Sequence, residues 1–138
     1  MPRVLILDDE ESLRQVLCDV FQEAGYEVIP ADGGESGMRL FIEAPTELVI
    51  TDLIMPGKEG IETIRDIRHR SVEVKIIAIS GRGGPYVKAN LDRALAVGAD
   101  CAIPKPFTPS DILDAAYQLL NAPDESSQEE EDDPLGQE

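Results

Sequence analysis

Short, mostly apolar segments recur along residues 1–121 and alternate with longer amphipathic stretches. Short apolar runs of this kind are typical of strands that are covered on both faces, as in a parallel sheet. We therefore predict five buried strands. They are Val4–Leu7, Tyr26–Ile29, Leu48–Thr51, Ile76–Ser80 and Cys101–Ile103.

The first and last of the intervening stretches have the spacing of helices with one apolar face. In the first, apolar residues follow the i, i+3, i+4, i+7, i+8 and i+11 positions, and Gly25 then ends the helix. In the last, Thr108 or Ser110 can supply the N-terminal cap. The residues expected on the buried faces are Leu13, Val16, Leu17, Val20, Phe21 and Ala24 in the first helix, and Ile112, Leu113, Ala116, Leu119 and Leu120 in the last.

Three more helices are predicted between these two. Weaker apolar repeats indicate helices over 33–43 and around 61–67, and a further helix begins near Val87 and ends at Gly98. The apolar face of the helix that begins near Val87 consists of Val87, Leu91, Ala94 and Leu95.

Strands that alternate with helices imply right-handed βαβ units and a parallel sheet. Five strands are too few for an eight-stranded barrel, so we predict an α/β fold, an open, doubly wound (βα)5 sheet with helices on both faces. Such sheets place functional groups beyond the carboxyl ends of their strands, near the point where the strand order reverses.

Composition limits the functions that this fold can serve. The chain has 28 acidic and 12 basic residues and a formal charge of −16, which argues against direct contact with nucleic acid or an anionic membrane. No apolar run reaches the roughly 20 residues of a membrane helix and no secretory signal is visible, so a cytoplasmic protein is expected. Cys18 and Cys101 lie far apart in apolar contexts and are expected to be reduced core residues.

Acidic residues are concentrated at the end of the chain. Residues 122–138 contain eight acids and no base, so we predict one folded domain, 1–121, followed by an acidic disordered tail, 122–138. The tail fits a solubilising role or an interaction or autoinhibitory role, and its residues do not decide between them.

Polar side chains follow four of the predicted strands. Asp8 and Asp9 follow the first, Asp52 the third, Ser80 closes the fourth, and Lys105 follows the fifth. Because the carboxyl ends of parallel strands meet at one rim, three carboxylates, a hydroxyl and an ammonium are expected to converge. Mg²⁺ would relieve the repulsion among the carboxylates, and metal and ammonium together would neutralise a phosphoryl group that one carboxylate attacks. Taken singly, each residue also fits a helix cap, a turn or a solvated loop.

Five segments, in this order and at these spacings, resemble the receiver domain of two-component response regulators. They are LILDDEESLR at 5–14, LVITDLIMPGKEG at 48–60, AIS at 78–80, GAD at 98–100 and KPF at 105–107. The resemblance covers about residues 3–121. It implies a flavodoxin-like or CheY-like sheet with strand order 2-1-3-4-5.

The resemblance assigns roles to the converging carboxylates. It implies that Asp52 is the phosphoacceptor and forms an aspartyl phosphate. It implies that Asp8, Asp9 and Asp52 hold Mg²⁺, with the backbone carbonyl of Ile54 as a further ligand.

Further roles follow from the same resemblance. Ser80 would hydrogen-bond the phosphoryl group after transfer, and Lys105 would form an ion pair with Asp52 or its phosphate. The peptide bond before Pro106 is expected to be cis. The donor would be a phosphohistidine on a sensor histidine kinase or histidine phosphotransfer protein. The domain would hydrolyse its own acyl phosphate slowly without being an enzyme in the usual sense.

Two features depart from the family pattern. Ala102 stands where receiver domains usually carry Tyr or Phe, so the usual aromatic readout is absent, and the glycine-rich loop 81–85 is a candidate for a different one. No nucleic-acid-binding pattern follows the domain, so a complete chain is expected to act through a downstream protein target, whereas a fragment could have had its effector removed. A homodimer formed through the last helices rests on the resemblance alone.

Two other functions stay open. A Mg²⁺-dependent phosphohydrolase with an Asp nucleophile would need a general acid near Asp52, and the following Leu53 and Ile54 supply none. A receiver-like scaffold that binds partners without taking phosphate ranks below a working receiver, because all the expected polar residues are present. The substitution at Ala102 keeps the scaffold open.

Overall fold

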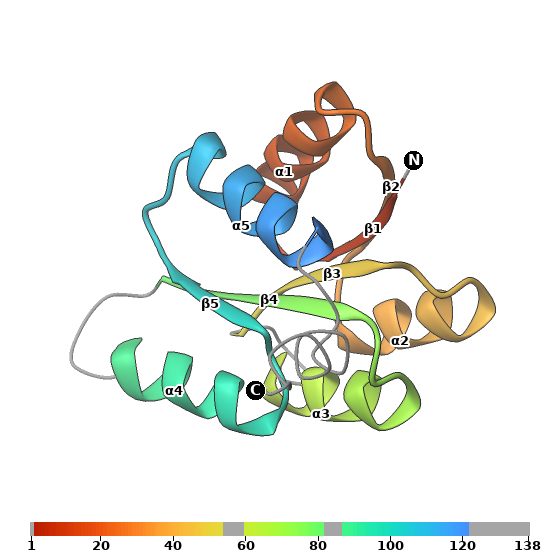
Figure 1. Cartoon of the computed structure of the whole chain (residues 1–138), viewed down its shortest axis with the longest axis vertical. Helices are drawn as coiled ribbons and strands as arrows, with labels where there is room; N and C mark the ends of the chain where they lie inside the picture. Colours follow the sequence, from red (N-terminus) through yellow and green to blue (C-terminus); the bar gives the residue numbers. More distant parts are fainter. Residues whose placement is uncertain (1, 54–59, 82–86, 122–138) are drawn as a thin grey trace, which may run out of the picture.

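The computed structural model describes residues 2–53, 60–81 and 87–121, and within them five strands alternate with five helices (Figure 1). They are β1 Arg3–Leu7, α1 Glu11–Glu23, β2 Glu27–Ala31, α2 Gly34–Glu43, β3 Leu48–Asp52, α3 Gly60–Arg70, β4 Lys75–Ser80, α4 Val87–Val97, β5 Cys101–Pro104 and α5 Pro109–Asn121. The alternation matches the prediction. The expectations for Ile54, for residues 82–85 of the glycine-rich loop and for the tail at 122–138 fall outside the described residues.

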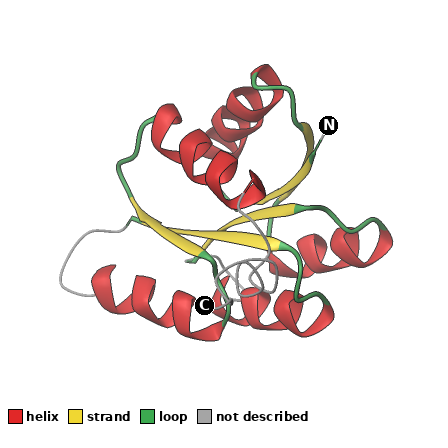
Figure 2. Ribbon diagram, viewed as in Figure 1, coloured by secondary structure: helices red, strands yellow, loops and turns green. Residues whose placement is uncertain are grey.

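The strands form one parallel sheet in the order β2-β1-β3-β4-β5 (Figure 2). This confirms the predicted α/β class, the doubly wound (βα)5 arrangement and the strand order. The chain reverses its direction of travel across the sheet at β1, which lies between β2 and β3. The carboxyl ends of β1 and β3 therefore flank the crevice where sheets of this kind place their functional groups.

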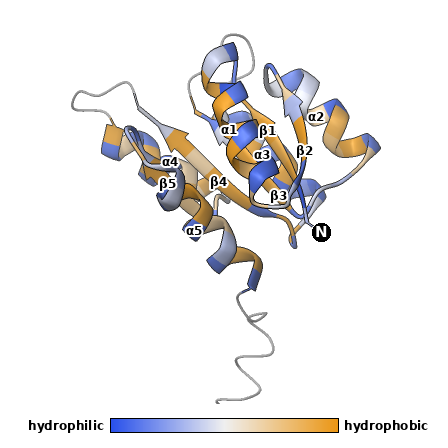
Figure 3. Ribbon diagram, turned by 90° about the horizontal axis from the view of Figure 1, so that it is seen from above, coloured by the Kyte–Doolittle hydropathy of each residue, from blue (hydrophilic) through white to orange (hydrophobic). Residues whose placement is uncertain are grey.

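Helices cover both faces of the sheet, with α1 and α5 on one face and α2, α3 and α4 on the other (Figure 1). Alternate residues of each central strand pack into opposite layers, because side chains of a strand alternate between its faces. In β1, Val4 and Ile6 pack with Phe21 and Ile112, whereas Leu5 packs into the opposite layer. Figure 3 shows the resulting apolar sheet between the helices. Burial on both faces explains why the strand sequences are continuously apolar.

The second strand begins and ends later than predicted. It runs over Glu27–Ala31 and includes Pro30, instead of Tyr26–Ile29. Tyr26 belongs to the turn before it and packs edge-on against Phe21, with ring centroids 4.9 Å apart. Pro30 fits in β2 because β2 is at the edge of the sheet, where a missing backbone N–H is tolerated.

Three predicted helix boundaries are observed. Gly25 and Gly98 follow α1 and α4 with φ angles of 97° and 132°, the left-handed conformation that ends helices. Thr108, and not Ser110, caps α5. Thr108 Oγ1 accepts the backbone N–H of Asp111 at 3.1 Å, and an Asp111 carboxylate oxygen accepts the backbone N–H of Thr108 at 2.9 Å. This reciprocal pair is a capping box.

Three residues placed on buried helix faces are in fact exposed, and one of them is Ala24 at the end of α1. Val16 of α1 is 53% exposed and Leu95 of α4 is 46% exposed. Both lie at the margins of their apolar faces, and the spacing of residues along a helix does not show how far the neighbouring elements reach over such a margin.

Cys18 is buried, Cys101 is half-buried, and both are free thiols. Burial raises the pKa of each thiol, which keeps it protonated and unreactive. None of the described helices is both long enough and apolar enough to cross a membrane.

Candidate functional site

The carboxyl ends of four strands bring together the residues that the sequence spacing singled out. Asp8 directly follows β1, Asp52 is the last residue of β3, Ser80 is the last residue of β4, and Lys105 directly follows β5. Ser80 pairs with Pro104 in the sheet register, so β4 and β5 end level with each other. The rim predicted from the alternation of strands and helices is present.

Asp52 and Lys105 form an ion pair at this rim. Lys105 Nζ lies 2.9 Å from an Asp52 carboxylate oxygen, within hydrogen-bonding distance. The Asp52 side chain is only 9% exposed and that of Lys105 is 25% exposed. Partial burial strengthens the attraction between them, because little water screens it. The pair joins residues 53 positions apart, at the ends of β3 and β5, which lie on either side of β4.

Asp8 is a buried carboxylate in an unfavourable environment. Its exposure is 2%, and burial is the main reason that its pKa is raised above the ordinary value of 3.8. The nearby carboxylates of Asp52 and Asp9 raise the pKa further, whereas a hydrogen bond from the Glu10 backbone and the charge of Lys105 lower it. The repulsion expected among these carboxylates is therefore present in the fold.

The reading of Asp8 as a helix cap is not supported. The N-cap of α1 is Glu10, and it makes no side-chain capping bond. Asp8 Oδ1 instead accepts the Glu10 backbone N–H at 2.9 Å. Arg14 of α1 donates from Nη1 to the Asp8 backbone carbonyl at 2.8 Å, a contact that sequence reasoning missed because nothing in the spacing relates this arginine to the rim. Asp9 is exposed.

Ser80 is 1% exposed, and among the described residues its Oγ has no hydrogen-bond partner. A buried hydroxyl without a partner is unfavourable by about 1–3 kcal/mol. Such an orphaned donor at a rim of charged groups is suited to an anionic ligand that arrives from outside.

The donor set suits a hard cation with a partial shell of protein ligands. Among the described residues, no three metal-ligating side chains form a ready-made cluster. Mg²⁺ does not need one, since it is commonly held by one or two carboxylates and keeps several waters. Asp8, Asp52 and the exposed Asp9 offer such oxygens, and Ile54 lies outside the described residues.

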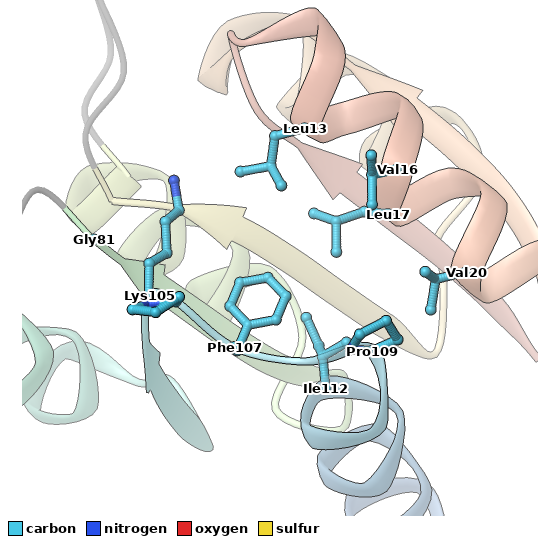
Figure 4. Close-up of a pocket in the computed structure, with 10 residues that line it drawn as sticks. Leu13, Val16, Leu17, Val20, Gly81, Lys105, Phe107, Pro109 and Ile112 are labelled. Carbon is cyan, nitrogen blue, oxygen red and sulfur yellow. The ribbon is translucent and has the colours of Figure 1, made fainter.

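An apolar groove adjoins the ion pair (Figure 4). It has a volume of about 440 Å³ and lies between α1 and the segment that joins β5 to α5. Gly81 and Lys105 line the end that meets the rim formed by the strand ends. The remaining lining residues are Leu13, Val16, Leu17, Val20, Pro106, Phe107, Pro109 and Ile112. Sequence reasoning assigned several of these residues to the core and did not predict a groove.

Comparison with known proteins identifies the family. A sequence model of the response regulator receiver domain matches residues 4–117, which is most of the chain. The chain belongs to this family. Receiver domains are the phosphoacceptor signalling domains of two-component systems, so the resemblance inferred from the sequence is confirmed.

Among curated relatives, this receiver domain is 36% identical over 127 residues to the transcriptional regulatory protein AruR of Pseudomonas aeruginosa, covering 87% of the chain and 50% of AruR. It is 33% identical over 120 residues to the aerobic respiration control protein ArcA of Escherichia coli, covering 87% of the chain and 49% of ArcA. The chain thus spans about half the length of the curated relatives it matches.

Solved structures agree with the fold. A response regulator receiver domain from Clostridium thermocellum superposes with a TM-score of 0.81 at 28% identity, covering 88% of this chain and 95% of that one. The chemotaxis protein CheY4 of Vibrio cholerae gives a TM-score of 0.77 at 30% identity, covering 86% and 98%.

This chain has a small residue where receiver domains usually carry Tyr or Phe. Ala102 is half-buried in β5 and pairs with Ala78 of β4. The peptide bond between Lys105 and Pro106 is cis, as the resemblance implied.

Proposed function

We propose that this receiver domain accepts a phosphoryl group on Asp52 from the phosphohistidine of a sensor histidine kinase or histidine phosphotransfer protein. The observation that carries the proposal is the buried Asp52 carboxylate, which lies 2.9 Å from Lys105 Nζ at a rim that also holds Asp8 and Ser80. Together these residues supply a nucleophile, a cation, a metal-binding carboxylate and a hydroxyl donor.

The proposed transfer uses groups of this chain. An Asp52 carboxylate oxygen attacks phosphorus, the new P–O bond forms as the P–N bond of the donor breaks, and the imidazole leaves with the electron pair. The Lys105 ammonium stabilises negative charge on the transferring phosphoryl oxygens. The Ser80 hydroxyl then donates a hydrogen bond to one of these oxygens. Slow attack by water on phosphorus breaks the P–O bond to Asp52, releases inorganic phosphate and restores the carboxylate, so the domain switches itself off without turning over a separate substrate.

Mg²⁺ is the proposed cofactor, held by Asp8, Asp9, Asp52 and the backbone carbonyl of Ile54. The crowding of Asp8 with like charges supports this assignment, because a divalent cation neutralises them. When bound, the cation also neutralises charge on the phosphoryl group. Asp8 and Asp9 would add metal-binding carboxylates to a rim that already holds the Lys105 ammonium.

The groove between α1 and the β5–α5 segment is the proposed contact for the phosphodonor protein. Its lining is apolar, Val16 on its wall is 53% exposed, and its end is formed by Lys105, which contacts Asp52. A partner seated there buries apolar surface while its phosphohistidine reaches the rim. Output is proposed to pass to a downstream protein target, with no direct nucleic-acid contact by this acidic domain.

We propose further that the receiver domain extends over 1–121 and is followed by an acidic tail, 122–138, and that the protein works in the cytoplasm. The charge asymmetry of the sequence supports the boundary. A homodimer through the last helices stays a proposal from the family alone.

A scaffold that binds partners without phosphorylation is the second candidate. The absence of an aromatic residue at Ala102 favours it, because the usual side-chain readout cannot operate. The intact ion pair and the orphaned Ser80 hydroxyl favour the phosphoacceptor instead, since a scaffold has no need of either.

Incubation with acetyl phosphate and Mg²⁺, followed by intact-mass measurement, tests the proposal. The wild-type domain is expected to gain the mass of one phosphoryl group, and Asp52→Asn and samples without Mg²⁺ are expected to gain none. Asp92→Asn, which changes a carboxylate of a surface ion pair in α4, is the matched control and is expected to behave as wild type. An unlabelled wild-type domain would favour the scaffold. Turnover of an aryl phosphate would favour the phosphohydrolase.

A further inference from the structure

We propose that Gly60 is a positioning residue for Asp52, because the absence of a side chain at Gly60 lets the start of α3 lie directly on the Asp52–Leu53 peptide. The inference rests on the proposed function of Asp52 and adds a residue that does not itself touch the phosphoryl group. Gly60 is the first residue of α3 and is buried.

The contact between Gly60 and the phosphoacceptor is made by backbone atoms. The Gly60 N–H donates to the Leu53 carbonyl at 3.2 Å. A Cβ atom added to Gly60 would come closer than 3.0 Å to the Asp52 carbonyl oxygen and to Leu53 Cα. Neither atom can rotate away, unlike the end of a flexible side chain, so a substitution must move α3, the peptide or both.

The same peptide is held from other sides. The Leu53 N–H donates to the Ile79 carbonyl of β4 at 2.9 Å, and Thr51 Oγ1 donates to the Asp52 carbonyl at 3.0 Å. The peptide is thus fixed between β4 and the first residue of α3. Pressure from α3 therefore displaces the backbone that carries the Asp52 carboxylate.

Lys105 is anchored by its backbone to β4 and makes no backbone hydrogen bond with this peptide. Its backbone N–H donates to the Ser80 carbonyl at 2.9 Å, and its ammonium reaches Asp52 across the rim. A shift of Asp52 that Lys105 does not share changes the distance between carboxylate and ammonium. Because hydrogen bonds weaken steeply with distance and angle, a small displacement is enough to weaken the pair.

Gly33 provides a matched control. It also precedes a helix, as the N-cap of α2, but a Cβ added there meets nothing within 4 Å, and its φ of −176° is extended backbone open to any residue. Gly33→Ala and Gly60→Ala thus make the same chemical change at the start of neighbouring helices, one in open space and one against the phosphoacceptor.

The first readout is the Lys105 ammonium signal in proton–nitrogen NMR spectra of the metal-free protein, assigned by its loss in Lys105→Met. We expect the signal of the wild type to be retained in Gly33→Ala and to be shifted or lost in Gly60→Ala. Backbone amide signals of α5, in the opposite layer, should not move. A purely structural loss of stability would leave the Lys105 signal of the folded fraction unchanged.

The second readout is the rate of labelling by acetyl phosphate with Mg²⁺. Gly60→Ala is expected to lower the rate constant by roughly ten-fold or more, as expected when a stabilising group is moved out of place. Gly33→Ala is expected to match the wild type. An unlabelled wild type would refute the phosphoacceptor proposal while leaving the NMR comparison valid. A labelled wild type together with a Gly60→Ala protein that matches it in both readouts would overturn this inference.

If Gly60→Ala does not fold, Thr51→Val tests the same point more gently. It removes the hydrogen bond to the Asp52 carbonyl while keeping the volume of the fully buried side chain. A shifted Lys105 signal and slower labelling would support the view that the position of this peptide sets the carboxylate. An unchanged signal and rate would contradict it.

Discussion

Asp8 is the residue at which burial and charge conflict most clearly. Its pKa is raised chiefly by burial, so the folded state holds its proton more tightly than the unfolded chain does. Between the ordinary carboxyl value of 3.8 and the raised folded value, stability falls as pH rises, and it stays lower at neutral pH. The ionised group that is needed for a cation thus weakens the metal-free fold.

Replacing Asp8 by Asn should therefore separate stability from metal binding. At pH 7 without metal, Asp8→Asn is expected to melt at a higher temperature than the wild type, and the difference should shrink as pH falls from the raised folded pKa towards about 3.8. Mg²⁺ affinity should fall by at least the roughly 10- to 100-fold that loss of an outer-shell partner costs. Calorimetry at several pH values and a Mg²⁺ titration measure the two effects. A lower melting temperature with unchanged Mg²⁺ affinity would show that the role is wrong.

Ser80 is a residue whose hydroxyl is expected to matter for the phosphoryl group and not for the stability of the fold. Ser80→Ala removes a buried hydroxyl that has no partner among the described residues, so the free energy of unfolding should change by less than about 0.5 kcal/mol or rise slightly. Labelling by acetyl phosphate should reach a lower steady-state level, because the phosphorylated form loses a hydrogen bond to a charged group, worth about 1.5–3 kcal/mol. Urea unfolding and a labelling time course measure both. A destabilised variant with normal labelling would assign the hydroxyl to the fold instead.

The sequence was informative about these residues as a set and uninformative about their surroundings. Asp8, Asp52, Ser80 and Lys105 were predictable because each sits at a strand end, a position that the apolar pattern marks. The contact of Arg14 with the Asp8 carbonyl was not, because it depends on where α1 crosses the rim.

At the scale of elements, one arginine joins two helix ends. Arg68 Nη1 donates to the Val74 carbonyl at 2.7 Å, and Arg68 Nη2 donates to the Gly98 carbonyl at 2.8 Å and pairs with Asp100 at 2.7 Å. The same Asp100 oxygen accepts the Ile76 backbone N–H at 2.8 Å. Arg68 thus ties the end of α3 and the turn after it to the end of α4, next to the amino ends of β4 and β5 and away from the carboxyl end of β3, where Asp52 lies.

Arg68→Ala should lower the free energy of unfolding by about 2–4 kcal/mol, because several carbonyl groups and one carboxylate lose a charged donor together. The exposed Arg93 of α4 is the control, and Arg93→Ala is expected to change stability by less than about 0.5 kcal/mol. Urea unfolding of both proteins gives the comparison. Equal effects of the two substitutions would mean that the Arg68 contacts add nothing.

Element order and helix ends followed from local signals, whereas strand order did not. Gly25, Gly98 and Thr108 have local conformational preferences that act wherever the chain goes. The order 2-1-3-4-5 came only with the family resemblance, since alternation alone is compatible with several arrangements. The second strand was predicted to stop before Pro30, although its place at the sheet edge tolerates a proline.

At the scale of the molecule, the groove beside Lys105 is expected to matter for transfer from a protein donor and not for labelling by a small donor. Val16→Asp places a charge on the exposed apolar wall of the groove, away from the reacting atoms. The rate of transfer from a phosphorylated histidine kinase, one that labels the wild type, should fall at least roughly ten-fold. Labelling by acetyl phosphate should continue.

Ile42→Asp is the matched control for Val16→Asp. Ile42 is 47% exposed on α2, which lies on the opposite face of the sheet from α1. It is expected to leave both reactions unchanged. If Val16→Asp slowed transfer from the kinase no more than Ile42→Asp did, the groove would not be the contact for the donor.

The most direct test of the account is to locate the phosphoryl group itself. After labelling with acetyl phosphate and Mg²⁺, borohydride reduction converts an aspartyl phosphate to homoserine, which peptide mass mapping assigns to a position. We predict homoserine at Asp52 and at no other carboxylate. Homoserine at Asp8 or Asp9 with Asp52 unmodified would contradict the central claim that the carboxylate paired with Lys105 is the phosphoacceptor.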